Sequence, residues 1–285
     1  MGWAIIIATV FLMVLLSIIF QKLGFVNNSL LNQQETYLSL FTLATVGFLW
    51  WVDDYMNIKG IGKKKWLSWK FKMAWLLLLS GLWAYWFYSK LGWSGQLLVI
   101  PGFEWIELWF MFIPLFIFII IAAANSVNLT DWLDGLAGWL LLFAYIVYAY
   151  ITYDQWLFLL STLCVSIAAA LISFLWFNIK PAKFYMWDVW SLALWANLWL
   201  IAMLTNTVLI FIIVGAIFIF TTISVIIQLT SKKFRNGKKV FKIAPFHHHL
   251  EAIGWAEETV VFRMWIIGML CSVAGIIFYI ITKTT

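Results

Sequence analysis

Long apolar stretches separated by short polar segments run through the whole of this chain. A helix needs about 20 mostly apolar residues to cross a bilayer, and 65% of the 285 residues are hydrophobic while only 11% are charged. A water-soluble globule of this size cannot bury so much apolar surface. The chain is therefore predicted to be an all-α polytopic transmembrane helical bundle with about nine spans, at roughly 3–20, 37–52, 73–89, 106–124, 135–152, 156–177, 189–204, 208–229 and 261–281.

The basic residues predict the orientation of the spans, because cytoplasmic loops near span ends collect Lys and Arg. Alternating spans place all 18 Lys and Arg residues on the side of the N-terminus except Lys22, Lys90 and Lys283. We therefore expect a cytoplasmic N-terminus. This bias, with attraction to anionic lipid headgroups, explains the net charge of +6 without a nucleic-acid partner. A polyanionic substrate held by the same loops is a second interpretation.

Aspartates stand at the ends of three apolar segments: Asp53 and Asp54, Asp131 and Asp134, and Asp188. A charge at hydrocarbon depth costs a few kcal/mol, so ionisable groups in spanning proteins tend to serve function. The predicted orientation puts these aspartates, and three histidines at 247–249, at the cytoplasmic face. Carboxylates gathered at one face favour metal and phosphate chemistry, whereas a transport path needs charges near the middle of the spans.

The two cysteines, Cys164 and Cys271, both lie within apolar segments. A small buried side chain is the expected role there, and no disulfide framework is implied. No low-complexity tract or internal repeat divides the sequence. Residues 1–285 are therefore expected to form a single integral-membrane domain.

Four polar segments adjoin the apolar stretches. They are Asp53-Asp54-Tyr55, residues 125–137 (NSVNLTDWLDGLA), residues 177–188 (FNIKPAKFYMWD) and residues 244–255 (APFHHHLEAIGW). In this order, over Met1 to about Trp265, they resemble phospho-N-acetylmuramoyl-pentapeptide transferase, a bacterial membrane enzyme family of peptidoglycan synthesis. Four long motifs in the family's order are far more specific than any one of them.

The resemblance implies transfer of phospho-MurNAc-pentapeptide from a uridine diphosphate carrier to undecaprenyl phosphate, with release of UMP and use of Mg²⁺. The implied location is the bacterial cytoplasmic membrane, with a homodimer left open. By the same resemblance Asp188 binds the metal, and Asp53 and Asp54 form a catalytic pair in which Asp53 keeps the lipid phosphate ionised. The residues suit this chemistry, because Mg²⁺ prefers carboxylate, substrate and water oxygens.

Substrate-binding roles are also implied by the resemblance. Tyr185 is expected to stack on uracil, and Asn178 and the backbone near Leu133 and Asp134 to offer hydrogen bonds. His247 is expected to reach the diphosphate or the nucleotide. The implied substrate-binding set is Asn128, Asp131, Leu133, Asp134, Asn178, Tyr185, His247, His248 and His249.

Tryptophan stands where the family has glycine at 3, 66, 132, 139, 187, 190, 195 and 199. Glycine beside a phosphate site permits close backbone approach, and an indole there is expected to crowd the site. The chain is then either a divergent or impaired enzyme, or, as we favour, a translation in which a codon read as glycine in the source became tryptophan. Asn57 and Thr221 also replace a family lysine and glutamate.

The sequence begins with Met1-Gly2-Trp3, which resembles the end of a longer family segment. A preceding span and a cytoplasmic loop are therefore expected to be missing, because the family has ten spans. Two alternatives remain: the chain is a related polyprenyl-phosphate N-acetylhexosamine-1-phosphate transferase, or it is an inactive homologue. The three histidines followed by Glu251, Gly254, Trp255 and Glu257 favour the muramoyl branch.

Overall fold

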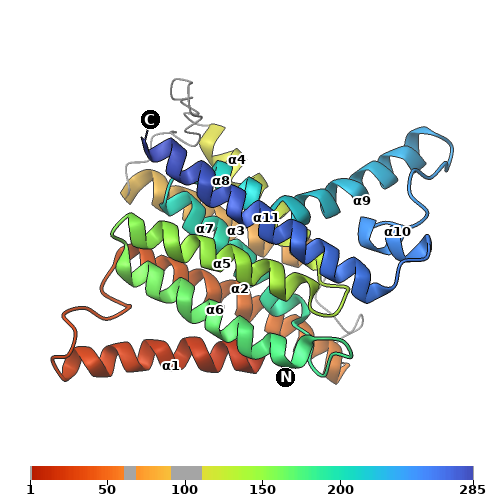
Figure 1. The fold of residues 1–285 in the computed structure, drawn as a ribbon. Helices are drawn as coiled ribbons and strands as arrows, with labels where there is room; N and C mark the ends of the chain where they lie inside the picture. The colour runs from red at the N-terminus through yellow and green to blue at the C-terminus, as the bar shows by residue number, and fades with distance from the viewer. Residues whose placement is uncertain (1, 61–68, 91–110, 285) are drawn as a thin grey trace.

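The computed structural model describes residues 2–60, 69–90 and 111–284, and within these ranges every regular element is an α-helix (Figure 1). This confirms the predicted fold class. The helices are α1 (Gly2–Lys22), α2 (Gln34–Lys59), α3 (Trp69–Lys90), α4 (Phe112–Thr130), α5 (Leu136–Asp154), α6 (Phe158–Asn178), α7 (Trp187–Leu204), α8 (Val208–Val214), α9 (Ala216–Phe234), α10 (Phe246–Ala252) and α11 (Glu257–Thr284).

Among the residues that the structure describes, four helices are long and apolar enough to cross a membrane: α5, α6, α9 and, over Glu257–Lys283, α11. Shorter apolar helical segments cover Ile7–Lys22, Met73–Phe87 and Ser191–Leu204. This is the pattern of a membrane protein, in which each backbone group is hydrogen-bonded within its own helix. The number of spans and the side of the N-terminus stay predictions, and residues 106–110 of the fourth predicted span lie outside the described part.

The eighth predicted span, 208–229, is wrong as a single helix. Gly215 separates α8 from α9, and α9 continues to Phe234. A Cβ atom at Gly215 would lie 2.7 Å from the Trp195 ring and 2.9 Å from the Phe211 carbonyl oxygen. The break therefore sits where the absent side chain lets Trp195 approach the backbone, a tertiary contact that the unbroken apolar run does not reveal.

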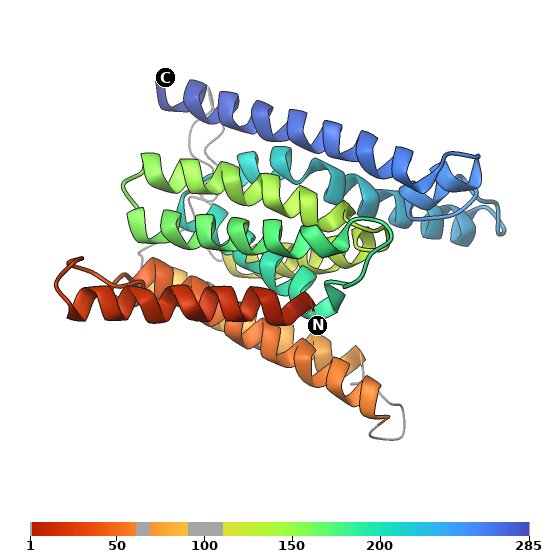
Figure 2. The ribbon, with the colours of Figure 1, turned by 60° about the horizontal axis from the view of Figure 1, so that its bottom comes forward.

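The consecutive helices α5, α6 and α7 alternate in direction and α11 runs parallel to α5, so the connecting turns gather at two ends (Figures 1 and 2). One end, called the site end below, joins the turn between α4 and α5 to the segment between α6 and α7 and to the start of α11. The opposite end joins the turn after α5 to the turn after α7 and to the end of α11. α9 leaves the bundle at the site end (Figure 1).

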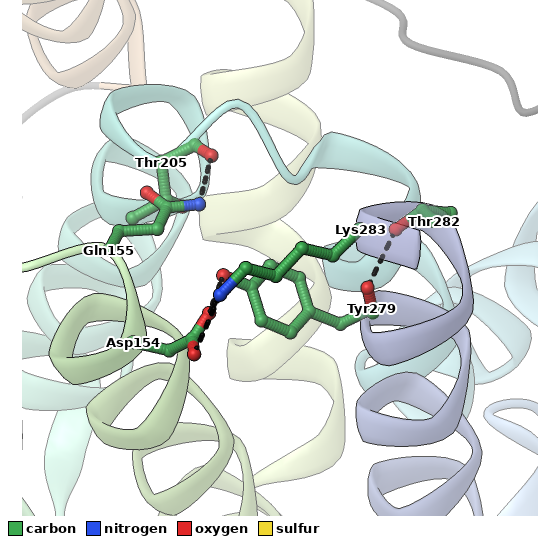
Figure 3. A network of polar contacts seen from close by, with 6 residues as sticks. All are labelled: Asp154, Gln155, Thr205, Tyr279, Thr282 and Lys283. Atoms are coloured by element: carbon green, nitrogen blue, oxygen red, sulfur yellow. Dashed lines mark hydrogen bonds and ion pairs between the residues drawn. The ribbon is translucent and has the colours of Figure 1, made fainter. Parts of the chain in front are cut away.

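At the opposite end, Asp154 ties the end of α5 to the end of α11 (Figure 3). The Lys283 amine donates to both carboxylate oxygens at 2.9 and 2.8 Å, and the Tyr279 hydroxyl donates to Oδ2 at 2.6 Å. The adjacent Gln155 amide donates to the Thr205 carbonyl at 2.9 Å. Because the lysine side chain is exposed, the charge pair itself adds at most about 1 kcal/mol.

A buried polar contact joins α2, α5 and α7 in the middle of the bundle. The Asn197 amide donates to the carbonyl and the hydroxyl of Ser39 at 2.8 and 2.6 Å. The Tyr145 hydroxyl donates to the Leu194 carbonyl at 2.7 Å and lies 3.2 Å from Asn197 Oδ1. All of these groups are buried. In an apolar surrounding an unpaired polar group is costly, so this contact fixes which faces of the three helices meet.

Replacing Asn197 by leucine is therefore expected to lower the free energy of unfolding by roughly 1–3 kcal/mol, because Ser39 and Tyr145 lose their partner. Thr162→Val is the control: Thr162 is exposed and bonds only within its own helix, so its change should stay within about 0.5 kcal/mol. The free energy of unfolding of both variants is measured by titrating the protein in mild-detergent micelles with a denaturing detergent. Equal stability of Asn197→Leu and the parent would contradict this assignment.

Candidate active site

Asn178, at the end of α6, joins two of the sequence motifs. Its Oδ1 accepts the Gly135 N–H at 3.1 Å, and its Nδ2 donates to the Phe184 carbonyl at 2.7 Å. Nearby, Asp134 Oδ2 accepts the Ala182 N–H at 3.0 Å. Asn178 is 3% exposed, so its own two hydrogen bonds are largely shielded from water. The loop 131–135 and the loop 179–186 are thereby held together as one structure.

Glycine is required at position 135 for this arrangement. Gly135 has φ +77°, a left-handed conformation that L side chains rarely adopt, and it is the N-cap residue just before α5. A Cβ atom there would also lie 3.3 Å from the Trp265 ring and 3.5 Å from the Asn178 carbonyl oxygen. The turn can therefore bring its N–H to Asn178 only because this residue has no side chain.

The two hydrogen bonds of Asn178 occupy both its side-chain oxygen Oδ1 and its side-chain nitrogen Nδ2. The resemblance implied a hydrogen bond from this amide to a nucleoside, and that role stays a prediction; the role visible here is to position the loops. Leu133 is buried and its carbonyl accepts the Leu136 N–H at 3.1 Å. Tyr185 is 56% exposed, so its ring is accessible, as stacking on a base requires.

The histidine run lies on α10 and contacts the loop 131–135. The rings of His248 and Trp132 meet edge to face with centroids 6.1 Å apart, and the His248 Nδ1 atom lies 2.6 Å from a carboxylate oxygen of Glu251. His249 Nδ1 accepts the backbone N–H of Lys242 at 3.1 Å. The fourth motif therefore lies beside the second.

His247 is the most enclosed of the three histidines, with 0% exposure. Neither ring nitrogen has a hydrogen-bond partner among the described residues. Burial, with a smaller contribution from His248, lowers the pKa of His247 to about 3. The imidazole is therefore neutral at physiological pH and keeps one donor and one acceptor for another group. Buried polar atoms without partners are rare in proteins and often mark a functional position.

Lys180 ties the loop 179–186 to the start of α11, a role not foreseen from the sequence. Its amine lies 2.7 Å from a carboxylate oxygen of Glu257 and 3.0 Å from one of Glu258. These two acids raise the pKa of Lys180 above its usual value. The only hint in the sequence is that Lys180 stands two residues after Asn178. Its acidic partners lie about 77 positions further along the chain, so the tertiary structure is needed to identify them.

The aspartate pair and Asp188 lie toward the same end of the bundle. The contact between Ser39 on α2 and Asn197 on α7 serves as a reference point. Asp188 precedes Asn197 by nine residues on α7, and Asp53 follows Ser39 by 14 residues on α2. At a helix rise of 1.5 Å per residue, Asp188 and Asp53 therefore lie about 13 and 21 Å from this contact, toward the same end of the bundle. Asp53 is buried, whereas the side chains of Asp54 and Asp188 lie outside the described residues.

Asn128 and Asp131, in the last turn of α4 and at its end, are both partly buried on the approach to the loop 131–135. No group of three or more His, Cys, Asp or Glu side chains able to hold a metal occurs among the residues that were described. Metal binding by Asp188 is therefore still a prediction.

Four of the tryptophans at family glycine positions can be placed, and one of them, Trp139, packs against Trp265 with ring centroids 4.9 Å apart. Trp132 is exposed beside His248, so it borders the predicted site without entering the packed interior. Trp195 and Trp199 are buried, and no acceptor for either indole N–H occurs among the described residues. The Trp187 side chain, expected to crowd the metal site, lies outside the described set.

The low pKa of His247 makes a prediction about pH. As pH falls below about 6.5 the unfolded chain takes up a proton that the folded protein does not, so stability should fall from there toward pH 3. His247→Gln removes this loss, which amounts to about 2 kcal/mol between pH 7 and pH 5. Unfolding measured at both pH values tests it, and equal pH dependence in the parent and the variant would contradict it.

Comparison with known proteins identifies the family of this chain. Residues 36–206 match the family model described as Glycosyl transferase family 4. The phospho-N-acetylmuramoyl-pentapeptide-transferase of Geobacillus sp. (strain WCH70) is 37% identical over 269 residues, which cover 93% of this chain and 81% of that protein. Proteins of the same name from Pelagibacter ubique (strain HTCC1062) and Dichelobacter nodosus (strain VCS1703A) are 37% and 35% identical, covering 86% of this chain and 73% of each relative. The chain therefore belongs to the phospho-N-acetylmuramoyl-pentapeptide-transferase family.

Proposed function

We propose that this protein transfers phospho-MurNAc-pentapeptide from its UDP carrier to undecaprenyl phosphate and releases UMP. The observation that carries the proposal is the joining of the second, third and fourth motifs at one end of a membrane bundle. Asn178 and Asp134 hold the loops 131–135 and 179–186 together, and Trp132 brings α10 against them. The family to which the chain belongs is named for the transfer of phospho-N-acetylmuramoyl-pentapeptide.

The joined loops suit the uridine part of the donor. Tyr185 offers an exposed ring for stacking, a contact worth about 1–3 kcal/mol for a base on an aromatic side chain. Leu133, Asp134 and Asn178 shape the wall beside it, with Asn128 and Asp131 on the approach from α4. His247, neutral and without a described partner, offers a hydrogen bond to the diphosphate, while His248 and His249 fix the position of α10.

The aspartates suit a magnesium ion in their donor chemistry. Carboxylate oxygens are the protein ligands that Mg²⁺ prefers, and Asp53 holds a buried carboxylate on α2 while Asp188 begins α7 at the same end. Asp188 is the proposed metal ligand, and Asp53 and Asp54 are the proposed catalytic pair. A magnesium ion held there would neutralise charge on the diphosphate. Asp53 is proposed to accept the proton of the lipid phosphate so that the phosphate oxygen can attack.

The location follows from the same orientation. The bias of the basic residues toward one side supports a site end that faces the cytoplasm, where a soluble nucleotide donor would reach it while the long acceptor lipid stays in the bilayer. We propose the bacterial cytoplasmic membrane as the site of this reaction.

The activity is tested with radiolabelled UDP-MurNAc-pentapeptide and undecaprenyl phosphate in proteoliposomes. The parent chain should release UMP and transfer label to lipid, EDTA should stop this, and added Mg²⁺ should restore it. Asp53→Asn and Asp188→Asn should each lower kcat by at least about a hundredfold, because the first removes the proposed base and the second the proposed metal ligand.

The matched control is Asp154→Asn, which changes an aspartate at the opposite end and should keep activity. Label that enters lipid only from UDP-N-acetylglucosamine would show a different transferase of the same superfamily and contradict the proposal. Full activity of Asp188→Asn would contradict the proposed metal ligand.

A further inference from the structure

The hairpin formed by α9, residues 235–245 and α10 lies beside the bundle (Figure 1) and encloses a small cavity of its own. The cavity has a volume of about 230 Å³. Three lysines line it, Lys232 from α9 and Lys239 and Lys242 from the returning segment, together with Gln228, Leu229 and Ile243. Lysines from two separate stretches of chain therefore face one space.

Hydrogen bonds fix the returning segment against α9. Gln228 Oε1 accepts the N–H groups of Val240 and Phe241, each at 3.0 Å, and Gln228 Nε2 donates to the Phe241 carbonyl at 2.8 Å. The Ser231 hydroxyl donates to the Lys238 carbonyl at 2.8 Å. Because the backbone on both sides of the cavity is fixed in this way, the lysines are brought together by the fold and not by chance on a loose loop.

The charge in this cavity is uncompensated. No acidic side chain lines it, and within the part of the chain that the structure describes none of the three lysines forms an ion pair. Like charges that share a small space repel each other, so an anion between them is favoured. A phosphate group has several oxygens, and lysine amines bind it as point charges. The shared chemistry of the expected ligand is therefore a phosphate.

The surroundings of the cavity distinguish a lipid phosphate from a free one. Leu229, Phe234, Val240 and Ile243, on the same hairpin, are all exposed apolar side chains. Basic residues next to exposed apolar ones are typical of segments that lie in the interface of a bilayer. A soluble phosphate has no use for the apolar part, whereas a phospholipid places its glycerol and upper acyl chain there.

We propose that this hairpin binds the headgroup of an anionic phospholipid, phosphatidylglycerol in the test below, with Lys232, Lys239 and Lys242 around the phosphate. The site also connects to the histidine run. The Lys242 N–H donates to His249 Nδ1 at 3.1 Å, and its amine donates to the Ala252 carbonyl at 3.3 Å. A lipid held by Lys242 therefore steadies α10, which carries His247. The proposal goes beyond the transfer reaction and does not require it.

Individual lipid binding to the purified full chain in a neutral detergent tests the proposal, with native mass spectrometry as the readout. Phosphatidylglycerol should bind more tightly than phosphatidylcholine with the same acyl chains. A variant that combines Lys232→Gln, Lys239→Gln and Lys242→Gln should lose this preference, with phosphatidylglycerol affinity reduced at least about tenfold.

The control combines Lys233→Gln, Arg235→Gln and Lys238→Gln, which removes the same charge from the same hairpin at residues that do not line the cavity. This control variant should keep the preference for phosphatidylglycerol over phosphatidylcholine. An equal loss of that preference in both triple variants would overturn the proposed site. Equal binding of the two lipids by the parent would do the same. Displacement by glycerol 3-phosphate at equal concentration would overturn the lipid assignment, and so would tighter binding of undecaprenyl phosphate in the same cavity. Because binding is measured without turnover, an inactive chain leaves this test valid.

Discussion

The side-chain amide of Asn178 is the interaction on which the candidate site depends. It takes the Gly135 N–H on one side and gives a hydrogen bond to the Phe184 carbonyl on the other, in a buried position where an unpaired amide would be costly. Asp134 adds a second bond between the same two loops. The bonds require the positive φ of Gly135, so the sequence of the turn, the packing of α5 against α6 and the position of Tyr185 are parts of one arrangement.

The helices were predictable because their cause is local: a long apolar run must form a helix in lipid, and polar residues end it. Asn178, the aspartates and the histidines were also picked out, as motif residues. What the sequence did not reveal depends on contacts between distant positions. The break at Gly215 needs the approach of Trp195, and the pairing of Lys180 with Glu257 needs α6 to end beside the start of α11. The bridging role of Asn178 likewise appears only when Gly135, 43 positions earlier, is placed beside it.

The tryptophans show how the unusual composition is accommodated. Trp195 packs against Phe211 and Phe218 with ring centroids 4.6 and 4.4 Å apart, across the contact of α7 with α8 and α9. This packing buries apolar area, but the indole N–H has no described acceptor, and a buried tryptophan N–H usually finds one. A glycine at 195 would instead leave room between these helices. Trp132, by contrast, is exposed beside His248, so the loop 131–135 carries this indole without burying it.

The central claim is that the loops 131–135 and 179–186 form a single nucleotide-binding structure. A double-mutant cycle between Asn178→Ala and Asp134→Ala, read out as the dissociation constant of UMP from the purified chain, tests it most directly. If the two bonds hold one structure, either change alone should remove most of the binding free energy, with a coupling of at least about 1 kcal/mol between them. Effects that add within about 0.5 kcal/mol would show that the two loops act independently, and would contradict the claim.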